Sequence, residues 1–295
     1  MAPPFVSVIL PVHNRASSIA RAVESVLAQT YRPLELLVVD DGSTDGTREV
    51  LARFGSEIVL LEQQHAGAYA ARNLALRHAR GELIAFLDSD DAWLPQKLEK
   101  QVPLFDREEV GLVFGDAVVV TPEAGRTRRT MFGITAPRRG RVAAHFAWGN
   151  FIPTVTVVAR RRCLVDFDPE LSADYVAWFR VALRYELDYV DDVVAEYTMH
   201  PGGMSSDLGR SLESRIALFT RELERTTGRE TRAVLRRLLF NLSWHLALAA
   251  VRGRARSVEH PLRLARRTAS RTGAPGWTAS FALHQLVSRG RRLFS

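Results

Sequence analysis

The sequence contains little cysteine and little lysine. Its single cysteine, Cys163, excludes an intrachain disulfide and a metal cage built from cysteines. Two lysines stand against 38 arginines, so arginine supplies nearly all of the positive charge. No G-x-G-x-x-G segment and no P-loop occur, which argues against a dinucleotide-binding or NTPase domain.

Long apolar runs are absent as well. None approaches the roughly 20 residues that a membrane-spanning helix needs. The segment from Leu238 to Val251 is shorter, is interrupted by polar residues and is typical of a buried helix. The residues before Phe5 lack the basic and apolar regions of a signal peptide. These features predict a cytoplasmic protein whose membrane contact, if it has any, is peripheral and on the inner face of the cell membrane.

The remaining composition is that of a globular protein, with 46% hydrophobic and 25% charged residues. The net charge of +7 is unevenly distributed, because residues 205–295 hold 18 arginines, no lysine and six acidic residues. Such a region is either a solvated helical face or the binding surface for a polyanion such as anionic lipid headgroups. We predict an α/β domain over residues 1–208 and an arginine-rich helical region over 209–295.

Apolar runs alternate with helical patterns through the first 110 residues. Strands are expected at 5–12, 34–39, 58–61 and 83–87, with helices near 19–27 and 66–79 and a short helix that carries Val50, Leu51 and Phe54. Strands that alternate with helices predict a doubly wound, mostly parallel sheet. Further strands are expected at 111–120, 151–158 and 189–197, and residues 121–142 read as an exposed excursion.

Carboxylates follow two of the expected strands. The run Leu83 to Leu87 leads directly into Asp88-Ser89-Asp90, and a parallel strand delivers such residues to the edge of the sheet where α/β folds bind ligands. In extended backbone the two carboxylates point the same way, roughly 6–7 Å apart. They are either ligands of a hard cation such as Mg²⁺ or Mn²⁺ or parts of a capping turn. A second acidic strand end, Asp40-Asp41, together with this one suits a nucleoside diphosphate.

Five motifs in order then resemble the family 2 glycosyltransferases of GT-A fold. They are VSVILPVHNR, ESVLAQTY, LLVVDDGSTDGT, AARNLAL and GELIAFLDSDD, all within residues 5–120, and the resemblance continues more loosely over 150–205. It implies a Rossmann-like sheet with a helical C-terminal extension. It also implies transfer of a sugar, with inversion, from a nucleotide-diphosphate sugar to an acceptor hydroxyl. Such enzymes build bacterial cell-surface polysaccharide, lipopolysaccharide or glycolipid, on glycan or lipid-linked acceptors.

The resemblance assigns roles to residues of this sequence. Asp88 and Asp90 match the D-x-D motif that binds Mn²⁺ or Mg²⁺, and His200 matches a loop histidine that approaches the metal or diphosphate. Asp174 matches the general base, although Ala173 replaces the glutamate that precedes it in relatives. The residues implied in nucleotide-sugar binding are Pro11, Val12, Asn14, Asp40, Asp41, Arg72, Asp88 and Ser89.

Elementary chemistry agrees with these roles. A leaving diphosphate is stabilised by a divalent cation, and the attacking hydroxyl needs a base. Asp168, Glu170 and Asp116 remain alternatives to Asp174 as that base. Three other functions remain open: a non-catalytic nucleotide-sugar-binding module, a phosphohydrolase of the haloacid dehalogenase type, and nucleic-acid binding through the arginine-rich region. That region contains no nucleic-acid-binding motif, so no nucleic-acid partner is expected.

Overall fold

The computed structural model describes residues 3–121, 125–170, 172–199 and 208–251. The chain divides into two compact units. The first comprises residues 1–142, 150–169 and 177–201, and the second comprises residues 143–149, 170–176 and 202–295.

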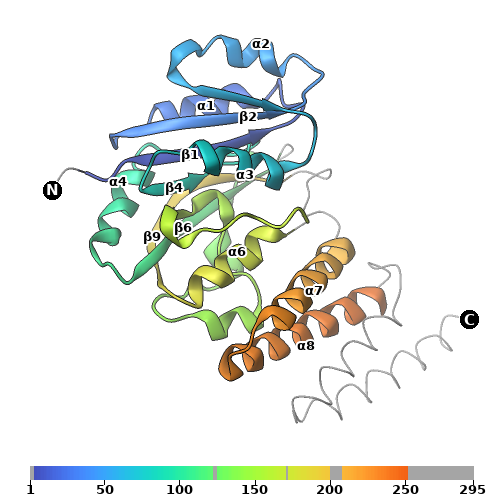
Figure 1. Cartoon of the computed structure of the whole chain (residues 1–295). Coiled ribbons are helices and arrows are strands. Elements are labelled where there is room, and N and C mark those ends of the chain that lie inside the picture. Colours follow the sequence, from blue (N-terminus) through green and yellow to red (C-terminus); the bar gives the residue numbers. More distant parts are fainter. Residues whose placement is uncertain (1–2, 122–124, 171, 200–207, 252–295) are drawn as a thin grey trace, which may run out of the picture. The chain divides into compact units, whose positions relative to one another are not determined.

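A nine-stranded sheet forms the first unit (Figure 1). Its strands follow the order β3-β2-β1-β4-β8-β6-β9-β5, and β7 pairs with β6. Pairing is parallel from β3 to β4 and between β6 and β9, whereas β5, β7 and β8 pair antiparallel. The strands are β1 (Val6–Val12), β2 (Leu34–Asp41), β3 (Val59–Gln63), β4 (Leu83–Phe86), β5 (Ala92–Trp93), β6 (Val110–Thr121), β7 (Gly125–Thr130), β8 (Val158–Arg160) and β9 (Glu186–Thr198).

Helices lie on both sides of the parallel strands. The α-helices are α1 (Ile19–Leu27), α2 (Thr47–Ala52), α3 (Ala68–His78), α4 (Lys97–Gln101), α5 (Met131–Ile134), α6 (Ala173–Ala182), α7 (Leu208–Arg225) and α8 (Arg229–Val251). Short 3₁₀ helices occur at Gly55–Glu57, Val102–Asp106, Ala143–Trp148, Thr154–Thr156 and Arg161–Cys163. Helix α3 contacts β1 and β2 and lies across the sheet from α1 in Figure 1.

The period of two along β1 explains its place in the core. Val8 and Leu10 point to one face, where they join a buried cluster with Val23 and Val26 of α1. Ile9 alternates with them and is also fully buried, as expected for a parallel strand covered on both faces. The predicted α/β sheet is therefore confirmed, and its parallel half places the ends of β1, β2 and β4 at one edge.

Two segments differ from the sequence prediction. The strand predicted at 151–158 is wrong for most of its length, because a 3₁₀ turn occupies Thr154–Thr156 and only Val158–Arg160 is a strand. Pro153 accepts a hydrogen bond from Thr156 Oγ1 at 2.7 Å, and this bond closes the turn. The predicted excursion at 121–142 contains strand β7, which pairs with β6.

The second unit has its own aromatic centre. Tyr175 stacks on Phe146 and meets the ring of Phe219 edge-on, with ring centroids 5.7 and 5.0 Å apart. Its hydroxyl donates to the Phe146 carbonyl at 2.6 Å. Helices α7 and α8 pack together and bury leucines such as Leu212 and Leu239. No described helix has the length and apolar character needed to cross a membrane. Most of the predicted arginine-rich region lies outside the described residues, and its contact with membrane stays a prediction.

A lysine is fully buried in the first unit. Lys97 Nζ donates to Gln101 Oε1 at 2.7 Å and lies 4.1 Å from the centre of the Trp93 ring. Gln101 in turn donates to the Thr156 carbonyl at 2.9 Å. Burial holds the pKa of Lys97 well below its ordinary value, because the charged form loses its water. The folded state therefore favours the neutral amine.

This shift gives the first prediction. Since the unfolded chain binds the Lys97 proton more tightly, folding stability should rise with pH between the lowered pKa and about 10.4, by up to about 1.4 kcal/mol per pH unit. Lys97→Met should remove that part of the slope. Urea unfolding from pH 7 to pH 10 measures it, with Lys100→Met, an exposed neighbour, as the control. Equal slopes for the wild type and Lys97→Met would contradict the prediction.

Candidate active site

The ends of three parallel strands bring the predicted carboxylates to one edge of the sheet. The register pairs Val12 with Asp40, and the Leu87 amide, just after β4, donates to the Ile9 carbonyl at 3.1 Å. The chain then enters the segment that begins at Asp88. Residues 13–18, 40–47 and 88–91 therefore follow neighbouring strands.

Asp41 is buried and receives donors on both carboxylate oxygens. Gln63 Nε2 and the Ala66 amide donate to Oδ1 at 2.7 and 2.8 Å, and the Gly67 amide donates to Oδ2 at 2.8 Å. Gly67 adopts a φ of +94°, which favours glycine. Burial alone would raise the pKa of Asp41, but these hydrogen bonds outweigh it and the pKa lies below its ordinary value. Asp41 is therefore an anion that organises the turn before α3.

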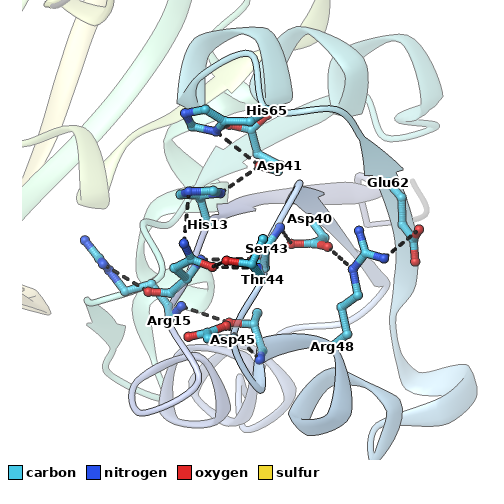
Figure 2. Close-up of polar contacts among 12 residues, drawn as sticks. His13, Arg15, Asp40, Asp41, Ser43, Thr44, Asp45, Arg48, Glu62 and His65 are labelled. Atoms are coloured by element: carbon cyan, nitrogen blue, oxygen red, sulfur yellow. Dashed lines mark hydrogen bonds and ion pairs between the residues drawn. The ribbon is translucent and has the colours of Figure 1, made fainter.

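Two histidines meet at Asp41 (Figure 2). The Nδ1 atom of His13 lies 2.8 Å from the Asp41 carbonyl oxygen. The Nδ1 atom of His65 lies 2.9 Å from Asp41 Oδ2 and 3.2 Å from the same carbonyl. The two rings stack with centroids 4.1 Å apart. Asp41 is thus a structural anchor for both imidazoles.

Asp40 faces the other way and is tied to α2. Its carboxylate accepts from the Ser43 amide at 3.1 Å and from Arg48 Nε at 2.5 Å. Arg48 also approaches Glu62, as Figure 2 shows. Asp40 is completely buried, so its charge depends on these donors.

Asn14 connects the turns after β1 and β2. It adopts a φ of +51°, which asparagine tolerates better than most residues. Its amide donates to Ser43 Oγ at 3.0 Å, and its side-chain oxygen accepts from the Thr44 amide at 2.8 Å. Ala16 adds a parallel link to Asp45 at 3.1 Å. The two turns therefore form one hydrogen-bonded rim. Pro11 and Val12 lie just before it, buried at the end of β1.

The Asp88 side chain pairs with Arg72 of α3. Arg72 Nη2 donates to Asp88 Oδ1, and the guanidinium carbon lies 5.0 Å from the centre of the Tyr69 ring. The Arg72 side chain is 3% exposed and that of Asp88 29% exposed. A buried arginine thus presents its charge to a half-exposed carboxylate. This pair brings together two of the predicted nucleotide-sugar-binding residues.

The backbone of the turn 88–90 is held by its carbonyl oxygens. Ser18 Oγ donates to the Ser89 carbonyl at 2.9 Å. Arg21 Nη2 and Thr198 Oγ1 both donate to the Asp90 carbonyl, at 2.9 and 2.6 Å. The turn 88–90 is therefore fixed through its backbone carbonyl oxygens, and Asp88 adds the side-chain bond that its Oδ1 accepts from Arg72.

Asp91, the residue after this turn, contacts the end of β9. It is buried, and its Oδ1 accepts from the Thr198 amide at 2.7 Å. Burial first, and then the charges of Asp88 and Asp90, hold the pKa of Asp91 well above its ordinary value. Asp91 therefore connects the turn to the end of β9, a role that sequence reasoning missed.

The predicted base, Asp174, and its three alternatives each have a defined local setting. Asp174 lies in the first turn of α6, where the macrodipole stabilises an anion. The preceding Ala173 is buried. The three alternative carboxylates all have partners: Asp168 pairs with Arg180 at 3.1 Å, Glu170 pairs with Arg221 at 2.6 Å, and Asp116 accepts from the amides of Ala117 and Phe132 at 2.8 Å. His200 lies outside the described residues.

Sequence reasoning missed several residues of this edge, namely His13, Arg21, His65, Asp91 and Thr198. Asp91 adjoins the D-x-D motif and His13 precedes Asn14, so their positions were the available signals. Arg21, His65 and Thr198 gave none, because each meets its partner only through the pairing of distant segments.

Comparison with known proteins identifies the family. The model of glycosyl transferase family 2 matches residues 7–163. Glycosyltransferase AglE of Haloferax volcanii is 32% identical over 212 residues, which cover 68% of this chain and 69% of that protein. A glucosyltransferase of Escherichia coli, WfgD, is 44% identical over 117 residues, which cover 39% of this chain and less than half of that protein, 46%. The chain belongs to glycosyl transferase family 2.

A solved structure shows the same fold. The mannosyltransferase PcManGT of Pyrobaculum calidifontis, solved in complex with GDP-Man and Mn²⁺, superposes with a TM-score of 0.62 at 22% identity. The alignment covers 98% of this chain and 86% of that one. The protein is therefore a glycosyltransferase with a GT-A sheet and a helical C-terminal part.

The donors around Asp41 generate the second prediction. Asp41→Asn places an amide NH₂ against N–H donors, so it should lower the free energy of unfolding by about 2–4 kcal/mol at pH 7. The difference should shrink as the pH falls below about 3.9, because the wild type loses the stability of its ionised, hydrogen-bonded Asp41 there. Denaturant unfolding at pH 7 and pH 3 measures both.

Asp166→Asn is the control for that prediction, since Asp166 is exposed and its nearest cation, Arg77, is 3.9 Å away. It should change stability by less than about 0.5 kcal/mol. An Asp41→Asn protein as stable as this control at pH 7 would show that the carboxylate is not the anchor described above.

Proposed function

We propose that the protein transfers a sugar from a nucleotide-diphosphate sugar to an acceptor hydroxyl, with inversion at the anomeric carbon. The observation that carries the proposal is the edge formed by residues 13–18, 40–47 and 88–91. There the half-exposed Asp88 faces the buried Arg72, and the turn 88–90 is fixed through its carbonyl oxygens. This edge lies within the residues that match the family model.

Asp88 and Asp90 fit a divalent cation, and we assign them to it. Both carboxylates supply the oxygen ligands that Mg²⁺ and Mn²⁺ prefer, and the carbonyls of the turn are already satisfied by Ser18, Arg21 and Thr198. The bound cation would stabilise the negative charge of the leaving diphosphate. The Mn²⁺ complex of the similar mannosyltransferase supports this assignment. We assign His200 to the same cation because of its position in the sequence.

The nucleotide-sugar is assigned to the neighbouring strand ends. Asp40 and Asp41 lie at the end of β2, and Pro11 and Val12 at the end of β1. Asn14 links the turns that follow β1 and β2 through hydrogen bonds, so the proposed nucleotide-binding surface needs little rearrangement. Arg72 supplies positive charge beside Asp88, and we assign it to the diphosphate. Ser89, the residue after Asp88, is assigned to the same part of the nucleotide-sugar.

Asp174 is our assignment for the general base. It lies in the first turn of α6, at the positive end of the helix dipole, and a carboxylate can accept the proton of the acceptor hydroxyl. The residue before the proposed base is the buried Ala173, where the family resemblance implies a glutamate.

The acceptor is proposed to be a cell-surface glycan or its lipid-linked precursor. WfgD is named as a glucosyltransferase from UDP-Glc to a GlcNAc-diphosphoundecaprenol, and the match to it covers less than half of that enzyme. Release of nucleoside diphosphate from a panel of nucleotide-sugars in Mn²⁺ tests the proposed function, and binding without turnover would favour the non-catalytic module.

The third prediction concerns the cation. Asp90→Asn should abolish transfer and weaken binding of the nucleotide-sugar in Mn²⁺, because one oxygen ligand loses its charge. Isothermal calorimetry and product release measure the two effects. Asp166→Asn, away from this edge, should behave as wild type. Full activity of the wild type in EDTA would rule out the metal assignment.

The fourth prediction concerns the base. Asp174→Asn should bind donor and Mn²⁺ as the wild type does and lose about 10²–10⁴-fold in turnover, the usual loss for a positioned base. Asp174 lies inside the first turn of α6, where loss of a charge costs at most about 1 kcal/mol, so the melting temperature should change little. Asp168→Asn is the comparison variant. If Asp174→Asn keeps more than about a tenth of wild-type turnover, Asp174 is not the base.

A further inference from the structure

The residue that precedes helix α6 has an unusual backbone conformation. Ser172 adopts a φ of +64°, in the left-handed region that residues other than glycine seldom occupy. Its carbonyl oxygen accepts from the Tyr175 amide at 3.1 Å, so this strained residue belongs to the first turn of α6. Strain of this kind persists only where the surrounding structure enforces it. Other contacts must therefore hold Ser172.

Helix α7 supplies those contacts. The hydroxyl oxygens of Ser172 and Ser211 lie 3.1 Å apart, and Arg215 Nε donates to Ser172 Oγ at 3.3 Å. Ser211 and Arg215 are four residues apart, so they lie on one face of α7. Both serines are buried, where loss of a hydrogen-bond partner is costly. The conformation of Ser172 thus depends on a helix of the C-terminal region.

The same face of α7 contacts the residue that follows Asp174. The guanidinium carbon of Arg215 lies 5.4 Å from the centre of the Tyr175 ring. Phe219, four residues further along α7, meets that ring edge-on with centroids 5.0 Å apart. Arg215 therefore contacts residues on both sides of Asp174 in the sequence.

A second arginine of α7 holds the start of this turn. Arg221 pairs with Glu170 at 2.6 Å, and the Glu170 carbonyl oxygen accepts from the Ala173 amide at 3.2 Å. All these contacts lie within the second unit. The first turn of α6 is thus held by α7 at several points, of which Arg215 is the one that reaches both Ser172 and Tyr175.

We propose that Arg215 is a positioning residue for the transfer reaction. Through Ser172 and Tyr175 it fixes the first turn of α6, and with it the position of the Asp174 carboxylate. The proposal rests on the proposed function, in which Asp174 is the general base. A base must lie within hydrogen-bond reach of the proton that it accepts, and a misplacement of about 1 Å can cost about 10²-fold in rate.

Arg215→Met tests the proposal, because methionine keeps an unbranched apolar stem and removes the donor. Release of nucleoside diphosphate in Mn²⁺, from the nucleotide-sugar that turns over fastest in the panel above, should slow by about 10–100-fold. KM for that nucleotide-sugar should not change, the pattern of an interaction that acts only in the transition state. Arg225→Met, at the exposed end of α7, is the control and should behave as the wild type.

A double variant separates positioning from general damage. In the Asp174→Asn protein, Arg215→Met should cause no further loss of turnover, because Arg215 acts through Asp174. A purely structural role would cause the same fractional loss with and without Asp174.

Ser172→Gly and Ser172→Val test the backbone conformation. Both remove the hydroxyl, but glycine adopts a positive φ freely and valine does not. Ser172→Gly should therefore keep more turnover than Ser172→Val. Circular dichroism checks the folding of every variant, and this pair decides the question if Arg215→Met does not fold.

Hydrogen exchange reads the turn without any substrate. The amides of Ala173 and Tyr175, which donate to the carbonyls of Glu170 and Ser172, should exchange faster in Arg215→Met than in the wild type. Unchanged exchange would overturn the proposal.

Three kinetic results would overturn the proposal while leaving the proposed function intact. They are full turnover in Arg215→Met, an equal fractional loss in the Asp174→Asn background, and a Ser172→Val protein as active as Ser172→Gly. A different result, no release from any nucleotide-sugar by the wild type, would contradict the proposed function and this proposal with it.

Discussion

Negative charge gathered at one edge of a parallel sheet is the constraint on which the first unit depends. A buried carboxylate without donors costs several kcal/mol, and neighbouring carboxylates raise that cost. Three acids at this edge each have their own compensation: Asp41 from backbone amides and Gln63, Asp40 from Arg48, and Asp88 from Arg72. The turns after the strands have their conformations because they supply these donors. The hydrogen bonds and ion pairs of these acids thereby fix the turns at this edge.

Local signals in the sequence were enough to predict the parallel half of the sheet. A strand that is buried on both faces reads as a continuous apolar run, and residues 6–12, 34–39 and 83–87 are such runs. Their order and the helices between them determine the topology, so the edge where Asp40 and Asp88 lie followed directly. The assignment of Arg72 to the diphosphate side came from the family resemblance, and the structure places it against Asp88.

The remainder depends on contacts between distant segments, which no local period encodes. Thr198 meets Asp90 across 108 positions, and Arg21 meets Glu196 across 175. The sequence gave no sign of a role for His65, because the pairing of β2 with β3 and the turn at Gly67 bring it to Asp41. The predicted strand at 151–158 failed for a related reason. An apolar run can be buried as a strand or as a turn. Hydrogen bonds that Gln101 and Thr156 donate to carbonyls of this segment stabilise the turn.

The two lysines of the chain have opposite chemical character. Acylation of an amine requires that it be both unprotonated and accessible. Burial moves Lys97 toward the first condition, because it lowers the pKa, but it also makes the amine inaccessible. Lys100 is 41% exposed and forms an ion pair with Asp192 at 3.0 Å. An amine-reactive reagent should therefore label Lys100 in the native protein. Labelling of Lys97 requires the core between α4 and the sheet to open, so its rate measures that opening.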